Sequence, residues 1–230
     1  MRTGWDEKRP FAHELVSKIH RWNIPGINAI MVHGRSRLQR YSRLANWQYV
    51  NDVVAGDQDA TATHIPIVGN GDILSYNDYE TKVLANPNLV PCAMLGRGAL
   101  IKPWLPREIK ERRSWGWDIS SSERFDILKD FCRFGLEHWG TDQRGVNNCR
   151  RFLLEWLSFL HRYVPVGLLE QSHPARINQR PPRFMCGRDD LETLFMSDHP
   201  SDWIKISEML LGPVPDDFRF EPKHKANSYG

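Results

Sequence analysis

Three short corners in this sequence carry glycine with a polar or charged neighbour, and each follows an apolar segment typical of a buried strand. They are VHGRSR (32–37), GNGDIL (69–74) and LGRGAL (95–100). Glycine lets the backbone come close to a ligand, and the free N–H groups where a helix begins attract anions. Asn70, Gly71 and Asp72 with Gly96 and Arg97 are therefore a candidate phosphate cradle, in which Arg97 is the charged clamp. Ordinary tight turns explain the same glycines, and neither corner is the Gly-x-Gly-x-x-Gly fingerprint of a dinucleotide fold.

His33 ends the first apolar segment, directly before Gly34 and Arg35. At that position its ring faces the same edge as the two glycine corners. It could donate a hydrogen bond to a bound ring or to a substrate. A histidine whose ring is satisfied by the backbone at a strand end is the alternative interpretation.

The elements that must position these corners alternate between strand and helix. The spacing of Phe11, Leu15, Ile19 and Trp22 predicts a first helix. The predicted order is helix 9–22, strand 27–34, helix 46–56, strand 64–72, helix 76–85, strand 89–100 and helix 105–113. Such alternation is typical of parallel βαβ units, whose ligands lie beyond the carboxyl ends of the strands. A closed (β/α)8 barrel takes about 250 residues, so three βα units are half a barrel at most, or a small open sheet.

The pattern changes after a junction at 114–119, and no further strand is predicted. Ser120 and Glu123 form a Ser-x-x-Glu capping box ahead of an amphipathic stretch. Helices are predicted within 120–140, 147–164, 190–197 and 201–212. A connector at 171–190 carries three prolines, and the tail at 213–230 is expected to lie extended on the surface. The fold class is therefore α/β up to about residue 115 and all-α beyond it.

The composition is that of a globular protein of 230 residues, with 40% hydrophobic and 26% charged residues. None of the four cysteines has a Cys-x-x-Cys partner, which favours free buried thiols in a reducing compartment; they are Cys92, Cys132, Cys149 and Cys186. We expect no metal site. The sequence shows neither a signal-peptide core nor an apolar stretch long enough to span a bilayer. A cytoplasmic or nuclear protein without membrane contact is expected.

Arginine is concentrated in two stretches, although the net charge of the chain is only +3. The first holds Arg35, Arg37, Arg40 and Arg43 among Tyr41 and Trp47. The second holds Arg150, Arg151, Arg162, Arg176, Arg180, Arg183 and Arg188, against Glu155, Glu170, Asp189 and Asp190. Clustered arginine interleaved with aromatic residues suits a phosphate-rich partner such as a nucleic acid. A solvated basic surface is the alternative.

Several segments resemble the second half of the tRNA-dihydrouridine synthases. They are VHGRSRLQRYSRLANWQYV (32–50), IPIVGNGDILSYND (65–78) and LGRGALIKPWLPREIKE (95–111). The helical segments 117–142, 150–170 and 203–215 are similar to the eukaryotic branch that acts on the variable loop of tRNA. The resemblance implies the C-terminal half of an FMN-binding (β/α)8 TIM-type barrel over residues 1–115. A helical tRNA-binding domain with an extended tail is implied over residues 116–230.

That family reduces the C5–C6 double bond of a uridine in tRNA. NAD(P)H passes hydride to FMN, FMN passes it to uracil, and a cysteine protonates the base. By resemblance, His33 contacts the flavin, and the phosphate end is held by Asn70, Gly71, Asp72, Gly96 and Arg97. The candidate tRNA contacts are Arg35, Arg37, Arg150, Arg151 and Arg180. By the same resemblance, a monomer is expected for the full-length family, and tRNA is the expected partner.

The chain also departs from the family pattern. The barrel strand with an FMN-contacting lysine, the first half of the barrel and the loop with the catalytic cysteine are not found in these 230 residues. No zinc-finger cysteines are found either, and none of the four cysteines stands in the catalytic context. We therefore expect this chain alone to bind FMN weakly or not at all, and to lack reductase activity.

Two other functions are compatible with the same residues. The first is a non-catalytic RNA-binding remnant, in which the helical domain still binds tRNA without a flavin. The second is an unrelated phosphate-binding barrel enzyme such as an isomerase. An isomerase would need a catalytic carboxylate or lysine at a strand end, and Asp72 is the only carboxylate at the three corners.

Overall fold

The computed structural model describes residues 1–39, 41, 43–56, 65–86, 89–168, 176–178, 180–182 and 185–223. The chain divides into two compact units, which are treated separately below. The first unit holds Met1–Ala99, Pro103–Ser114 and residues 176–178. The second holds Leu100–Lys102 and most of the chain from Trp115 onward. The main division falls between Ser114 and Trp115, within the predicted junction at 114–119.

A small parallel sheet forms the centre of the first unit. Its strands are β1 (Ile30–His33), β2 (Ile67–Asn70) and β3 (Ala93–Met94), in that spatial order. His33 pairs with Asn70, and Asn70 pairs with Met94, so the carboxyl ends of the three strands lie level. Within the described residues the sheet has three strands and does not close into a barrel.

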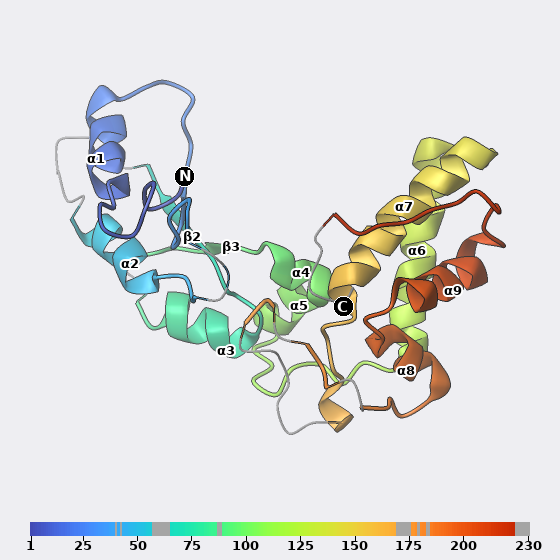
Figure 1. The fold of residues 1–230 in the computed structure, drawn as a ribbon. Helices are drawn as coiled ribbons and strands as arrows, with labels where there is room; N and C mark the ends of the chain where they lie inside the picture. Colours follow the sequence, from blue (N-terminus) through green and yellow to red (C-terminus); the bar gives the residue numbers. More distant parts are fainter. Residues whose placement is uncertain are drawn as a thin grey trace. The chain divides into compact units, whose positions relative to one another are not determined.

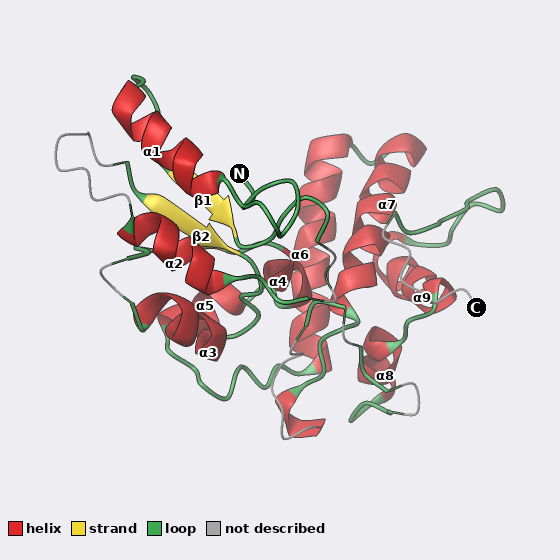
Figure 2. Ribbon diagram, turned by 60° about the vertical axis from the view of Figure 1, so that its left-hand side comes forward, coloured by secondary structure: helices red, strands yellow, loops and turns green. Residues whose placement is uncertain are grey.

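Short helices alternate with these strands, as the sequence predicts. They are α1 (Ala12–Trp22), α2 (Trp47–Ala55), α3 (Tyr76–Tyr79), α4 (Arg97–Ile101) and α5 (Leu105–Lys110). A π-helical turn, Glu80–Leu84, continues α3. Figures 1 and 2 show α1, α2 and α3 in a row on one side of the sheet. The apolar face of this row encloses a core with Val16, Val32, Val50 and Ile67.

The prediction of a strand over 89–100 is wrong for most of its length. Only Ala93–Met94 pairs with β2, and helix α4 already begins at Arg97. The segment has one β-branched residue, Val90, followed by Pro91, which has no N–H to donate to a ladder. An early start of α4 brings Arg97 to the carboxyl edge of the sheet.

The second unit consists of helices. They are α6 (Ser121–Trp139), α7 (Gln143–Leu160), a 3-10 turn (Val166–Leu168), α8 (Asp190–Met196) and α9 (Pro200–Leu211). The predicted capping box is confirmed, because Ser120 and Glu123 exchange side-chain to backbone hydrogen bonds ahead of α6. Helices α6 and α7 lie side by side in both views (Figures 1 and 2). Their facing apolar residues form a core with α9.

The segment after α9 is not simply extended on the surface. Phe218 is buried in the core of the second unit, and the Lys223 amide donates to the Glu155 carboxylate. Two of the free cysteines, Cys132 and Cys149, are buried, whereas Cys92 and Cys186 are exposed. In the described part of the chain, no helix has the length and apolar character of a membrane span, and no group of three potential metal ligands occurs.

Candidate anion-binding site at the carboxyl edge of the sheet

A pocket of about 230 Å³ lies in the first unit, at the carboxyl ends of the three strands. Its walls include all six residues that the sequence predicts to bind a cofactor: His33, Asn70, Gly71, Asp72, Gly96 and Arg97. The other lining residues are Arg2, Tyr41, Ile73, Leu74, Met94, Gly98 and Ile177. The register of the sheet explains this gathering, since it holds His33, Asn70 and Met94 at one level.

The Gly71–Asp72 corner has a backbone conformation that depends on its residue types. Gly71 has φ +125° and Asp72 has φ +52°, which glycine adopts freely and aspartate tolerates. The Trp47 indole donates to the Gly71 carbonyl at 2.7 Å and lies so close to Gly69 that a Cβ there would meet its ring at 2.4 Å. Trp47, the first residue of α2, therefore holds the Gly71–Asp72 corner in place.

Asp72 is engaged inside the protein and does not point a free carboxylate at the pocket. Its Oδ2 accepts from the Arg35 guanidinium at 2.5 Å and from the Ala45 amide at 2.6 Å. Its carbonyl accepts from the Lys82 ammonium at 2.5 Å. Asp72 is thus a positioning residue, which ties the corner to the loop before α2 and to the π-helical turn.

Asn70 and the two glycines of the third corner complete the same edge. The Asn70 side-chain amide donates to the Met94 carbonyl at 2.8 Å, which ties the end of β2 to that of β3. A Cβ on Gly98 would lie 2.2 Å from the Ile73 carbonyl, so only glycine allows α4 to approach this closely. A Cβ on Gly96 would meet nothing within 4 Å, so open space lies beside it.

The pocket has an excess of positive charge. Arg2, Arg35 and Arg97 influence one another and His33 electrostatically, and Asp72 is the acidic group among them. Arg97 stacks on the Tyr41 ring, with its guanidinium carbon 3.7 Å from the ring centroid. Burial lowers the pKa of Arg97 from its usual value, with a smaller contribution from Arg35 in the same direction. Since arginine stays charged in proteins, such a half-buried guanidinium favours a bound anion.

His33 adds an uncharged polar ring to this basic pocket. Its Nδ1 is buried and has no hydrogen-bond partner. Burial, followed by the nearby Arg35 and Arg2, lowers the pKa of His33 to about 4. The imidazole is therefore neutral at neutral pH and can exchange a hydrogen bond with a ligand without carrying charge.

Sequence reasoning missed Arg2, Tyr41, Met94 and Ile177 as lining residues. Arg2 forms a parallel bridge with His33, so it belongs to the same edge of the sheet. The sequence places Tyr41 among neighbouring arginines, whereas in the structure its ring stacks on Arg97, which lies 56 residues away. Ile177 comes from a segment far along the chain, and no local signal could have found it.

The five arginines predicted to contact tRNA have different environments. Arg35 and Arg150 are 1% and 0% exposed, so an exposed nucleic-acid contact is wrong for both side chains. Arg35 binds Asp72 and the Arg43 carbonyl, and Arg150 binds the carbonyls that follow α9. Arg37 and Arg151 are exposed, and Arg180 lies 3.7 Å from Asp198. Arg40 and Arg183 lie outside the described residues.

The comparison with protein families decides what kind of chain carries this pocket. A family model described as dihydrouridine synthase (Dus) matches residues 1–145, which include every pocket residue except Ile177. The chain belongs to the dihydrouridine synthase family. The resemblance inferred from the sequence is therefore confirmed.

Curated relatives of this dihydrouridine synthase chain extend the match beyond residue 145. Over 230 residues it is 57% identical to a Xenopus laevis protein named tRNA-dihydrouridine(47) synthase [NAD(P)(+)]-like. Proteins of the same name from Homo sapiens and Oryza sativa subsp. japonica are 56% and 53% identical over 229 residues. Each match covers 100% of this chain and 32–33% of the relative. The chain thus spans about a third of the length of the curated relatives it matches.

Proposed function

We propose that this chain is the part of a tRNA-dihydrouridine synthase that holds the phosphate end of FMN and contacts tRNA through its helical unit. One observation carries the proposal. Six residues from three separate corners, selected from the sequence, line a single basic pocket at the carboxyl edge of the sheet. Family membership makes FMN the anion that fits this pocket best.

The residues present fit a flavin phosphate. Arg2 and Arg97 line the pocket, and its one carboxylate, Asp72, is held by the buried Arg35 and by the Ala45 amide. Open space beside Gly96 lets a ligand approach its backbone. The unpartnered Nδ1 of His33 can bind a polar edge of the flavin ring. Bound FMN would carry hydride from NAD(P)H to the C5–C6 double bond of a uridine.

Each residue then has a distinct task. Arg97 clamps the phosphate and is itself oriented by Tyr41. The backbone at Gly71 and Gly96 lines the cradle, which Asn70 and Asp72 hold in shape from within. His33 stays neutral beside the ring, because protonation would add a further charge next to the arginines.

The helical unit offers groups for binding tRNA. Phe152 of α7 is 53% exposed and stacks face to face on Trp139 of α6, with ring centroids 4.8 Å apart. Exposed aromatic rings near arginine provide stacking platforms for unpaired bases. Arg151 is the exposed neighbour of Phe152, and these residues replace the buried Arg150 as candidate contacts. A target uridine has to leave its stack to be reduced, which requires such a surface.

Protonation of the reduced base needs a group that the pocket does not provide. None of the four cysteines is among the residues that line it, and only Cys92 and Cys186 are exposed. We therefore expect the isolated 230-residue chain to bind FMN weakly and to form no dihydrouridine. The RNA-binding remnant without catalysis is the second candidate, because the groups offered for tRNA lie in the helical unit and none of them belongs to the flavin pocket.

Flavin binding is tested by following the ring resonances of His33 in the 230-residue chain during titration with FMN or riboflavin. We expect FMN to bind about tenfold more tightly than riboflavin, which lacks the phosphate. Arg97→Ala should remove this difference. The control Arg107→Ala, on the exposed face of α5, should preserve it. Equal affinities for FMN and riboflavin in the unmodified chain would contradict the assignment.

Binding of tRNA separates the two candidates from an unrelated phosphate-binding enzyme. We expect the chain to bind tRNA with an affinity that falls steeply as salt rises. Phe152→Ala should weaken this binding, since stacking contributes about 1–3 kcal/mol per base. With FMN and NADPH present, no dihydrouridine should form. Absence of tRNA binding at low salt would exclude both candidates, and dihydrouridine formed by this chain would exclude the remnant.

A further inference from the structure

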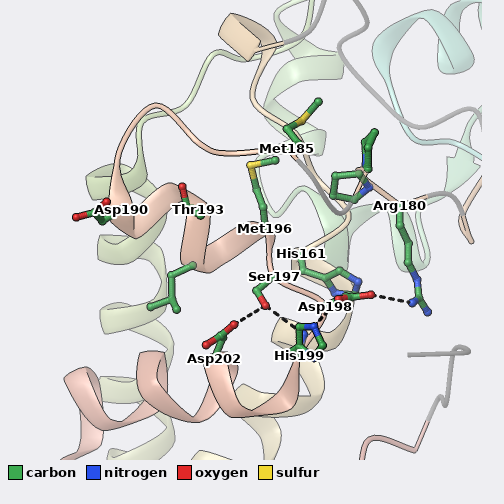
Figure 3. A pocket seen from close by; sticks show the side chains of 13 residues that line it. His161, Arg180, Met185, Asp190, Thr193, Met196, Ser197, Asp198, His199 and Asp202 are labelled. Carbon is green, nitrogen blue, oxygen red and sulfur yellow. Dashed lines mark hydrogen bonds and ion pairs between the residues drawn. The ribbon is translucent and has the colours of Figure 1, made fainter. Parts of the chain in front are cut away.

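A second cavity lies wholly within the helical unit and belongs to no part of the proposed flavin site. Its volume is about 290 Å³, near the lower limit of ordinary ligand pockets. Figure 3 shows its lining side chains, which come from the end of α7, from α8, from the start of α9 and from the segment around Arg180. A cavity of this size suits one planar ring system rather than a whole dinucleotide.

His161 is the unusual residue of this cavity. It is 2% exposed, and it is the C-cap residue directly after Leu160, the last residue of α7. Its Nδ1 lies 3.2 Å from the Leu157 carbonyl, which can only accept, so Nδ1 carries the proton. The Nε2 is therefore an acceptor, and it is buried without a partner. Burial and then Arg162 lower the pKa of His161 to about 3, so protonation does not relieve the unpaired atom at neutral pH.

Two of the three carboxylates that line the cavity, Asp198 and Asp202, already have partners. Asp202 accepts from the Ser197 hydroxyl at 2.6 Å and from Lys205 at 2.8 Å. Asp198 lies between Arg180 at 3.7 Å and His199 at 3.6 Å, and Figure 3 marks the contact with Arg180. These acidic groups repel a phosphate. The unpaired Nε2 of His161 can accept a hydrogen bond from a neutral donor.

The remaining wall is apolar and suits a flat ring. It consists of Pro181, Pro182, Met185, Leu194 and Met196. Proline rings and the flexible, polarizable methionine side chain pack well against aromatic faces. A ligand for this cavity therefore combines a flat apolar body with an edge that donates hydrogen bonds.

We propose that this cavity binds one unpaired RNA base that carries an exocyclic amino group, which donates to Nε2 of His161. The inference rests on the proposed function, which places tRNA against the helical unit. The phosphates of the RNA stay outside, away from Asp198 and Asp202. Uracil fits less well, because cytosine's projecting amino donor is replaced by a carbonyl acceptor, and the one donor left on that edge, N3–H, lies between two carbonyl oxygens. The cavity would thus recognise a base other than the uridine that is reduced.

The test uses the 230-residue chain and free nucleosides, which have no phosphate for the flavin pocket. Adenosine, cytidine and uridine are titrated while the His161 ring resonances are followed. We expect saturable shifts with adenosine and cytidine, at affinities about tenfold higher than for uridine, the effect of one buried acceptor gaining or missing its donor. Transfer RNA should shift the same resonances. Uridine binding as tightly as cytidine, no shift with any nucleoside, or no shift with tRNA would overturn the proposal.

A matched pair of variants locates the site. His161→Phe keeps a ring but removes the acceptor, and cytidine binding should fall about tenfold. His138→Phe makes the same change on the exposed end of α6 and should leave the affinity unaltered. An equal loss of cytidine affinity in His161→Phe and His138→Phe would overturn the assignment to His161. The comparison of cytidine with uridine needs no variant, so it stands even if His161→Phe does not fold. Dihydrouridine formation and FMN affinity are separate readouts, so failure here leaves the proposed function to its own tests.

Discussion

The Asp72 carboxylate accepts a hydrogen bond from the Arg35 guanidinium, and the two side chains are 4% and 1% exposed. Asp72 follows the second strand, whereas Arg35 follows the first. Their contact joins two neighbouring corners beneath the pocket. An ion pair in this position orders the backbone that lines the pocket without occupying the pocket itself.

Removing the charge of Asp72 should therefore destabilise the first unit strongly. Asp72→Asn preserves size and tolerates φ +52°, but it leaves the buried Arg35 without its counter-charge. We expect the free energy of unfolding to fall by about 3–5 kcal/mol, measured by urea denaturation. Glu7→Gln makes the same chemical change in the exposed pair with Arg43 and should cost less than about 1 kcal/mol. Similar losses of unfolding free energy in Asp72→Asn and Glu7→Gln would contradict a buried structural pair of Arg35 and Asp72.

Gly98 and Gly96 form a second matched pair. In an exposed helix Gly→Ala would stabilise by about 1 kcal/mol, but a Cβ on Gly98 meets the Ile73 carbonyl at 2.2 Å. We expect Gly98→Ala to lower the free energy of unfolding by about 1–3 kcal/mol. Gly96→Ala, with open space around its Cβ, should change it by less than about 0.5 kcal/mol. A neutral or stabilising Gly98→Ala would show that α4 does not approach the second corner as described.

Arg150 and Arg151 are adjacent in sequence, but substitution of Arg150 should lower stability, whereas substitution of Arg151 should lower tRNA binding. Arg150 donates to the Ser207 hydroxyl and to the Gly212 carbonyl, both at 2.8 Å, and so caps the end of α9. Arg150→Met should cost about 1–3 kcal/mol of unfolding free energy, because buried acceptors lose their donor. Arg151→Met should leave stability nearly unchanged and lower the salt slope of tRNA binding by about 1.

The two arginine variants need two measurements each, denaturation and tRNA binding at several salt concentrations. Loss of stability in Arg151→Met with none in Arg150→Met would reverse their assigned roles. A salt slope that is the same in Arg151→Met as in the unmodified chain would remove Arg151 from the tRNA surface.

Acidification should destabilise the helical unit through His161. Burial lowers the pKa of His161 from 6.5 to about 3, so the unfolded chain binds a proton that the folded chain does not. The stability contributed by the neutral ring is complete above pH 6.5 and is lost as the pH falls toward 3. Protonation of His161 alone lowers the free energy of unfolding by about 1.4 kcal/mol per pH unit in that window. Urea denaturation of the unmodified chain and of His161→Phe should show a shallower pH dependence in the variant. Parallel curves would mean that His161 protonates freely in the folded chain.

The corners of the first unit could be predicted because local rules govern them. Gly71 supplies a positive φ, and Ser120 and Glu123 cap a helix wherever they stand at that spacing. Parallel βαβ alternation then brings the strand ends to one edge, which is how six pocket residues could be selected without coordinates. Their predicted role in flavin binding stays a prediction.

What sequence could not supply was the partner of each charged side chain. Arg35 and Arg150 look like solvated arginines in an arginine-rich stretch, since composition places arginine on surfaces. Their burial depends on Asp72 and on the carbonyls after α9, which lie 37 and about 60 residues away. The strand predicted over 89–100 is wrong for a similar reason. Gly98 packs against the distant Ile73 carbonyl as part of helix α4, and the apolar residues around Gly98 do not reveal that contact.

The level strand ends also limit how the length of this chain can vary. Side chains alternate faces along a strand, so deleting one residue within 30–33 or 67–70 would turn His33 or Asn70 to the opposite face of the sheet. An added residue between 71 and 92 is absorbed by the connection instead. Insertions among related sequences should accordingly gather in the connections, while the spacing from Ile30 to His33 and from Ile67 to Asn70 stays fixed.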